Sequence, residues 1–159
     1  MIEIERKFLV LDDTYRKEAT ASSEMVQGFL SIDPVRTVRV RRMGEMAWIT
    51  IKGKTDSSGT TRMEWEYEIP AVEAEEMLLL CGPGILRKVR YHVPVGRHVF
   101  EVDEFLDENL GLVVAEVELK NVSETFEKPS WLGSEVTGEP SYYNSQLSLK
   151  PYSTWKDIK

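Results

Sequence analysis

The segment TRMEWEYEIP, residues 61–70, alternates charged and apolar side chains almost without interruption. Successive side chains of a β-strand point to opposite faces, so this alternation predicts a strand with one ionic face and one apolar face. The ionic face carries Arg62, Glu64, Glu66 and Glu68, and the apolar face carries Met63, Trp65, Tyr67 and Ile69. Whether the ionic face meets solvent or an enclosed space decides the fold.

The same alternation recurs along the chain and predicts a sheet of short strands joined by tight turns. Eight segments show it, at residues 2–10, 25–32, 35–43, 46–53, 61–70, 85–94, 98–105 and 112–121. Turn-forming residues lie between several of them, such as Asp33-Pro34, Gly44-Glu45 and Gly96. Connections this short favour antiparallel pairing over the longer crossovers of a parallel sheet.

Three stretches between and after the strands favour helix, at residues 12–20, 72–80 and part of 131–149. We expect Asp12-Asp13-Thr14 to cap the first, Gly82-Pro83 to end the second, and Ser141 to cap a turn in the third. The sequence therefore predicts a mainly β fold of the α+β type, with a few peripheral helices. Its length fits one domain, residues 1–159.

Ionic side chains of both signs occupy successive positions on the polar face of seven of the eight segments. In an ordinary antiparallel sheet such a face meets water. Eight strands also suffice to close a barrel whose interior holds one small ligand. Because long side chains of both signs fill the polar face and Ser or Thr is scarce there, we predict the closed form. Apolar residues then face outward, and the charges line the lumen of an eight-stranded antiparallel β-barrel tunnel.

The polar face of this predicted barrel carries acids and bases in similar number. The acids are Glu3, Glu5, Glu64, Glu66, Glu68, Glu101, Asp103, Glu116 and Glu118, and the bases are Lys7, Arg39, Arg41, Lys52, Arg62, Lys88, Arg90 and Lys120. Enclosing so many charges is costly, and their mutual pairing offsets only part of that cost. A divalent cation and a polyanion would complete the balance. Carboxylates suit Mg²⁺ or Mn²⁺, and Arg and Lys suit phosphate, so the pattern indicates metal-assisted phosphoryl transfer.

Composition excludes several other classes. The formal net charge of −7 does not favour nonspecific binding to nucleic acid or to an anionic membrane. The single Cys81 cannot form an intramolecular disulfide, and the chain shows neither a signal peptide nor a run of about 18 apolar residues, so we expect a cytoplasmic protein. These features also argue against a membrane barrel. His92 and His98 offer no good zinc set, and no P-loop is present.

Eight short motifs follow one another along the chain. They are Glu3-Ile-Glu5-Arg-Lys7, Gln27-Gly-Phe-Leu30, Val38-Arg39-Val-Arg41, Thr50-Ile-Lys52-Gly53, Arg62-Met-Glu64-Trp-Glu66, Lys88-Val-Arg90-Tyr91, Glu101-Val-Asp103 and Ala115-Glu116-Val-Glu118. In this order they resemble the motif set of the CYTH, or triphosphate tunnel metalloenzyme, superfamily, which begins with ExExK. Tyr143-Asn144 in the tail also resembles small bacterial members. The resemblance covers nearly the whole chain.

This resemblance implies a tunnel that binds Mg²⁺ or Mn²⁺ together with a triphosphate. Glu3, Glu5 and Glu118 would hold the catalytic metal, while Glu64, Asp103 and Glu116 would serve a second metal or position the water. The triphosphate would be bound by Lys7, Arg39, Arg41, Lys52, Arg62, Lys88 and Arg90. Lys88, which would orient or activate the water, and Glu5 are the catalytic candidates. For each of these residues the alternative is a structural ion pair inside the barrel.

Members of the superfamily act on inorganic triphosphate, thiamine triphosphate, nucleoside triphosphates or RNA 5′ ends, and some cyclise ATP. Only Met1-Ile2 precede Glu3, so the His-Phe element of class IV adenylyl cyclases is missing. We therefore expect hydrolysis of inorganic triphosphate to diphosphate and phosphate. A class IV-type adenylyl cyclase, a nucleoside or thiamine triphosphatase, and a non-catalytic polyphosphate or nucleotide sensor stay open as alternatives. The sequence leaves a homodimer open as well.

Overall fold

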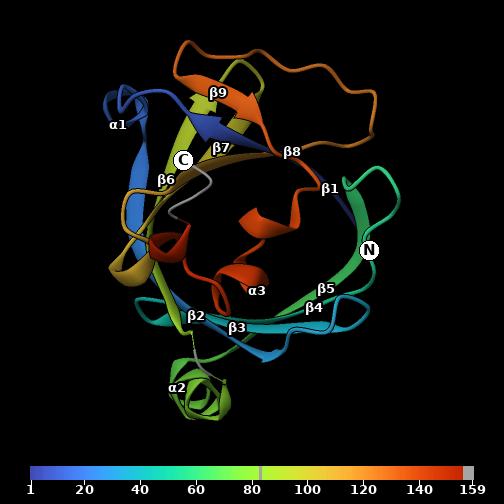
Figure 1. Cartoon of the computed structure of the whole chain (residues 1–159), viewed down its shortest axis with the longest axis vertical. Coiled ribbons are helices and arrows are strands. Elements are labelled where there is room, and N and C mark those ends of the chain that lie inside the picture. Colours follow the sequence, from blue (N-terminus) through green and yellow to red (C-terminus); the bar gives the residue numbers. More distant parts are fainter. Residues whose placement is uncertain (83, 156–159) are drawn as a thin grey trace.

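The computed structural model describes residues 1–82 and 84–155, and its strands form a closed ring (Figure 1). They are hydrogen-bonded in the order β5-β4-β3-β2-β6-β7-β8-β1, and pairing of β1 with β5 closes the barrel. Their bounds are β1 (Ile2–Val10), β2 (Ala21–Ser31), β3 (Thr37–Met43), β4 (Met46–Lys52), β5 (Thr61–Pro70), β6 (Leu86–Val95), β7 (His98–Phe105) and β8 (Val113–Glu118). All pairings are antiparallel, so the predicted eight-stranded antiparallel barrel is confirmed.

The strand bounds differ from the prediction mainly at two places. β2 begins at Ala21 rather than at residue 25, because its polar first residues are fixed by pairing with β6, where Ala21 lies opposite His92. A ninth strand, β9 (Leu132–Glu135), adds to the end of β1. Its four residues carry no clear alternation, so a pattern of period two could not reveal it.

The helices are short and lie between or after the strands. Their bounds are α1 (Tyr15–Glu18), α2 (Ala71–Leu80) and α3 (Asn144–Leu147), with 3₁₀ helices η1 (Asp107–Asn109), η2 (Pro140–Tyr142) and η3 (Tyr152–Thr154). The two predicted helices near residues 12–20 and 72–80 are confirmed, and α2 ends before Gly82; Pro83 lies outside the described residues. No described helix is long and apolar enough to cross a membrane.

The predicted cap at Ser141 is wrong. Pro140 starts η2, with Ser141 inside it, and α3 begins only at Asn144 with Tyr143 in the cap position. Proline is well suited to the first position of a helical turn, and here it overrides the capping preference of serine.

The apolar faces of the strands point outward, and part of this outer surface is covered by other segments, while Trp65 and Tyr67 on β5 are exposed. The largest cluster packs Phe8, Phe100 and Val117 of the barrel wall against Tyr15 and the fully buried Trp131. Burying an aromatic side chain of this size contributes about 2–3 kcal/mol. A smaller cluster seats α2 on β3 and β4, and Figure 1 shows α2 outside the ring.

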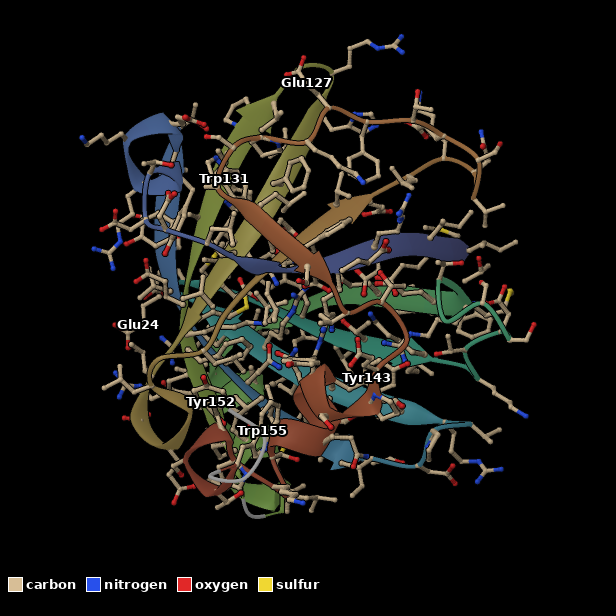
Figure 2. All side chains as sticks on the ribbon, turned by 45° about the horizontal axis from the view of Figure 1, so that its top comes forward. Glu24, Glu127, Trp131, Tyr143, Tyr152 and Trp155 are labelled. Atoms are coloured by element: carbon tan, nitrogen blue, oxygen red, sulfur yellow. The ribbon has the colours of Figure 1, made fainter. Side chains whose placement is uncertain are left out.

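The C-terminal segment folds into the ring and closes one end with apolar side chains. Figure 1 shows α3 inside the circle of strands. Tyr142, Leu147, Tyr152 and Trp155 from this segment pack with inward-facing wall residues, which are Leu9, Leu86, Phe105 and Val114. Figure 2 shows Tyr152 and Trp155 close together and well apart from Trp131. The barrel therefore has an ionic lumen along part of its length and an apolar plug at one end.

Candidate active site

A cavity of about 360 Å³ occupies the ionic part of the barrel. Every predicted site residue except Asp103 lines it: Glu3, Glu5, Lys7, Arg39, Arg41, Lys52, Arg62, Glu64, Lys88, Arg90, Glu116 and Glu118. Asp103 lies behind this lining, bonded to Lys88 and Arg90. The residues come from β1, β3, β4, β5, β6 and β8, so strands distant in sequence place their ionic faces on one enclosed space.

Strand register fixes which ionic residues lie opposite each other. Glu5 of β1 is the Cα partner of Glu118 on β8, and Lys52 of β4 is the partner of Glu64 on β5. Directly opposed side chains have their Cβ atoms about 5 Å apart, so like and unlike charges are forced close together. The acids of β1 and β8 therefore concentrate on one side of the lumen.

Glu3 is held by two cations, one from β4 and one from β5. Lys52 Nζ donates to both carboxylate oxygens of Glu3, at 2.8 and 3.0 Å, and Arg62 Nε lies 3.6 Å away. Burial alone would raise the pKa of Glu3, but Lys52, a hydrogen bond with Glu64 and Arg62 together hold it below its ordinary value. Burial and the hydrogen bond to Glu3 raise the pKa of Glu64 to about 7.

A second group of acids lies beside Glu3, on β1 and the neighbouring β8. Burial, together with the charges of Glu116 and Glu3, raises the pKa of Glu5 to about 8. Although burial opposes it, Lys7 and Arg90, together with a hydrogen bond to Glu5, lower the pKa of Glu116 to about 2. The pKa values of Glu5 and Glu116 thus shift in opposite directions, as those of Glu64 and Glu3 do, because neighbouring carboxylates disfavour each other's charge. Burial, Glu3 and Glu101 also raise the pKa of Glu118.

These acids fit a divalent cation by their chemistry. Carboxylates are hard oxygen donors, and neighbouring carboxylates that repel each other mark a place where positive charge is needed. In the described residues the acids form such pairs rather than a ready group of three ligands. The carboxylate of Glu3 is paired with Lys52, which partly explains why Glu3 does not lie together with two other acids as a ready set of ligands.

Two arginines on β3 face the lumen beside a carboxylate of β5. Arg41 Nη2 donates to Glu66 Oε2 at 3.0 Å, and Arg39 Nη2 lies 3.7 Å from the same oxygen. Burial and the charges of Arg41 and Arg90 lower the pKa of Arg39 to about 9. The guanidinium of Arg39 stays charged at neutral pH. The Nε atoms of Arg39 and Arg41 have no hydrogen-bond partner within the described part of the chain. An anion in the cavity would relieve the repulsion between them.

The most buried lumen cation is Lys88, of which only 1% is exposed. Its Nζ lies 2.9 Å from Asp103 Oδ2 and donates to Asn144 Oδ1 at 2.9 Å. Arg90 binds the same aspartate through both carboxylate oxygens, at 2.8 and 2.9 Å. Burial lowers the pKa of Lys88 to about 7, against the opposing charge of Asp103. The two cations hold the pKa of Asp103 far below its ordinary value despite its burial.

Several lining residues carried no predicted role. Thr137, Gly138, Tyr143, Asn144 and Ser145 all come from the C-terminal segment. Tyr143-Asn144 was noted as a motif, but spacing within a single segment gives no sign that this segment enters the lumen. Two predicted polar-face residues, Glu68 and Lys120, are exposed to solvent and are not among the described residues that line the cavity.

Known proteins of similar sequence and structure agree with this geometry. A family model for the CYTH domain matches residues 1–148. An inorganic triphosphatase from Acetivibrio thermocellus is 44% identical over 156 residues, 98% of each chain, and one from Nitrosomonas europaea is 32% identical over 94% of this chain and 98% of its own. The crystal structure of the inorganic triphosphatase NE1496 superposes with a TM-score of 0.65 at 28% identity, covering 92% of this chain and 94% of that one. The chain belongs to the CYTH domain family.

Proposed function

We propose that this protein hydrolyses inorganic triphosphate to diphosphate and phosphate with the help of a divalent metal ion. The observation that carries the proposal is the convergence of twelve of the thirteen predicted site residues on one enclosed ionic cavity. Relatives at 44% and 32% identity that bear the name inorganic triphosphatase support the choice of substrate. A free triphosphate ion is the small-molecule partner, and the unpaired Cys81 favours a reducing cytoplasm.

The acids of β1 and β8 are the proposed metal ligands. Glu3, Glu5 and Glu118 would hold the catalytic Mg²⁺ or Mn²⁺, and Glu64 and Glu116 would bind a second ion or position the water. A bound ion of this kind neutralises phosphate oxygens and polarises a nucleophilic water. Asp103 contributes indirectly, because its two carboxylate oxygens are already bonded to Arg90 and Lys88.

The cations of the lumen are the proposed triphosphate ligands. Arg39, Arg41 and Arg90 present planar forks that match phosphate oxygens, and Lys7, Lys52, Arg62 and Lys88 add point charges. They hold the chain of phosphates in line and offset the negative charge that develops on its oxygens. The water oxygen attacks the terminal phosphorus, the bond to the bridging oxygen breaks, and diphosphate leaves with that electron pair. Lys88 orients the water, and the proton that the water loses on attack passes to an oxygen of the phosphate products or to bulk water.

A substrate panel tests this proposal. The protein is incubated with Mg²⁺ or Mn²⁺ and either tripolyphosphate, ATP or thiamine triphosphate, and phosphate and cyclic AMP are measured. We expect phosphate release to be fastest from tripolyphosphate, to be abolished by EDTA and to produce no cyclic AMP. Cyclic AMP from ATP would identify a cyclase instead. Metal-dependent binding of tripolyphosphate without turnover would identify a sensor and contradict the proposal.

A further inference from the structure

We propose that Asn144 is a positioning residue of the hydrolysis, which fixes the ammonium group of Lys88 in the lumen from the C-terminal segment. The inference rests on the proposed function and deepens it. It assigns a catalytic consequence to a segment that otherwise serves to close the barrel.

The contacts of Lys88 are the first support. A lysine ammonium has three N–H donors. Here one meets Asn144 Oδ1 at 2.9 Å, and Asp103 Oδ2 lies at 2.9 Å from the same nitrogen. Two acceptors on different elements therefore set the direction of the group, and the remaining donor is left for the cavity that Lys88 lines. Without Asn144, the ammonium would keep its contact with Asp103, but two elements would no longer fix its direction toward the space that the substrate would fill.

The amide of Asn144 is itself held in one orientation. Gln27 Nε2 donates to Asn144 Oδ1 at 2.8 Å, so two donors converge on this oxygen and it must face Lys88. Gln27 is fully buried, and its Oε1 atom has no hydrogen-bond partner among the described residues. A buried acceptor without a partner destabilises the folded state. Stability of the fold therefore gives little reason for a glutamine at this position, whereas its hydrogen bond to Asn144 does.

The segment that carries Asn144 is anchored firmly enough to act in this way. Leu147, three residues later, is 1% exposed and packs in the apolar plug. Beyond it, the chain touches the barrel rim backbone to backbone: a Cβ added at Gly84, where φ is +91°, would lie 2.0 Å from the Ser148 carbonyl oxygen. The same segment also contacts Lys7, whose Nζ donates to the Tyr142 carbonyl at 3.3 Å. Figure 2 shows Tyr143 of this segment near the strands that bear the ionic residues.

Substitution of Asn144 should therefore change turnover rather than binding. Asn144→Ala removes the acceptor, and we expect kcat for tripolyphosphate to fall about tenfold while KM changes less than about twofold. Asn144→Asp keeps an oxygen of the same reach, so kcat should return to within about threefold of wild type. Its added negative charge in the lumen should raise KM. Steady-state kinetics with saturating Mg²⁺ measure both parameters.

Gln146→Ala is the matched control, because Gln146 lies in the same four-residue helix and is not among the described residues that line the cavity. We expect this variant to keep kcat within about twofold of wild type. Thermal unfolding of all three variants shows whether the plug stays in place. A loss of kcat in Gln146→Ala equal to that in Asn144→Ala would assign the effect to the helix and overturn the inference.

A double-mutant cycle decides whether Asn144 acts through Lys88. In a Lys88→Ala background, Asn144→Ala should reduce the residual kcat by less than about twofold, because the group that it positions is gone. An equal loss in both backgrounds would contradict the inference and leave the proposed function intact. Wild-type protein that releases no phosphate from tripolyphosphate would overturn the proposed function itself, and this inference with it.

Discussion

The barrel interior has two parts built on the same strands, and they differ sharply in chemistry. On β1 the inward-facing series runs Glu3, Glu5, Lys7 and then changes to Leu9, and on β8 Glu118 and Glu116 give way to Val114. β6 and β7 change in the same way, to Leu86 and Phe105. Alternation alone therefore does not tell what an inward face is for. The point where each series changes from ionic to apolar marks where the ionic lumen ends and the plug begins.

The apolar plug contributes mainly to stability, and the ionic lumen contributes mainly to function. Enclosed charges that repel one another, such as Glu5 beside Glu116, cost folding free energy. Apolar side chains buried by the tail, such as Trp155 and Leu147, contribute it. Substitutions in the plug should therefore change unfolding, and substitutions in the ionic lumen should change activity.

The largest effect should come from the plug. Trp155 is 3% exposed and stacks edge-on against Tyr142 and Tyr152. Trp155→Ala should lower the free energy of unfolding by about 3–5 kcal/mol, measured by urea denaturation. Trp65→Ala on the outer wall, where Trp65 is 39% exposed, is the control and should cost less than about 1–2 kcal/mol. Similar losses in the two variants would refute the assignment of stability to the plug.

The ionic lumen should respond in the opposite way. Glu118→Gln removes a proposed metal ligand, so kcat/KM for tripolyphosphate should fall about a hundredfold or more. Its melting temperature without metal should stay the same or rise, because burial and nearby acids already oppose the charge of Glu118. Glu68→Gln, on the exposed part of β5, should leave kcat/KM unchanged. A large loss of stability in Glu118→Gln would break the division between the two parts.

A smaller effect is expected from an ion pair on the outer wall. Glu104 accepts hydrogen bonds from the Tyr15 hydroxyl and from Arg16 Nε and Nη2, the latter two at 2.6 and 2.9 Å. Burial alone would raise the pKa of Glu104, but these donors hold it below its ordinary value of 4.5. The folded state therefore favours the charged form of Glu104. The contribution of this charge to the free energy of unfolding is complete above about pH 5 and is lost as pH falls through the lowered pKa.

Glu104→Gln should thus cost about 1 kcal/mol at pH 7, and the difference from wild type should shrink below about pH 4. Urea denaturation at a series of pH values measures it. Unlike Glu118→Gln, this variant should keep its triphosphatase activity. A difference in the free energy of unfolding that does not depend on pH would show that hydrogen bonding, and not the charge of Glu104, stabilises the folded state.

Much of the barrel could be predicted from sequence because strand alternation is local. Side-chain alternation within each strand was enough to place Glu3, Arg39, Glu64 and Glu118 on the ionic face of the sheet. Closure of the ring then brought these faces onto one cavity, as the structure shows. Eight strands and both signs of charge were the features that predicted closure.

The remainder depends on contacts between distant segments. β9 exists because β1 offers a free edge near Phe8, which its own four residues do not reveal. Tyr143-Asn144 stands out in the sequence as a motif without a role, yet the side chain of Asn144 contacts Gln27 on β2 and Lys88 on β6. The inward apolar residues Leu9 and Val114 were a usable signal of the plug, since they interrupt an otherwise ionic series.

The position of β1 has a consequence for how the protein acquires its activity. This first strand pairs with β5 through Glu3 and Arg62 and with β8 through Glu5 and Glu118, so it is the seam of the ring. Pairings between segments so distant in sequence form slowly during folding. A chain with every hairpin formed but the seam open holds the same acids on separate edges and cannot gather them around one ion. The recovery of catalysis during refolding should therefore lag behind the recovery of β-structure and report the moment at which the seam closes.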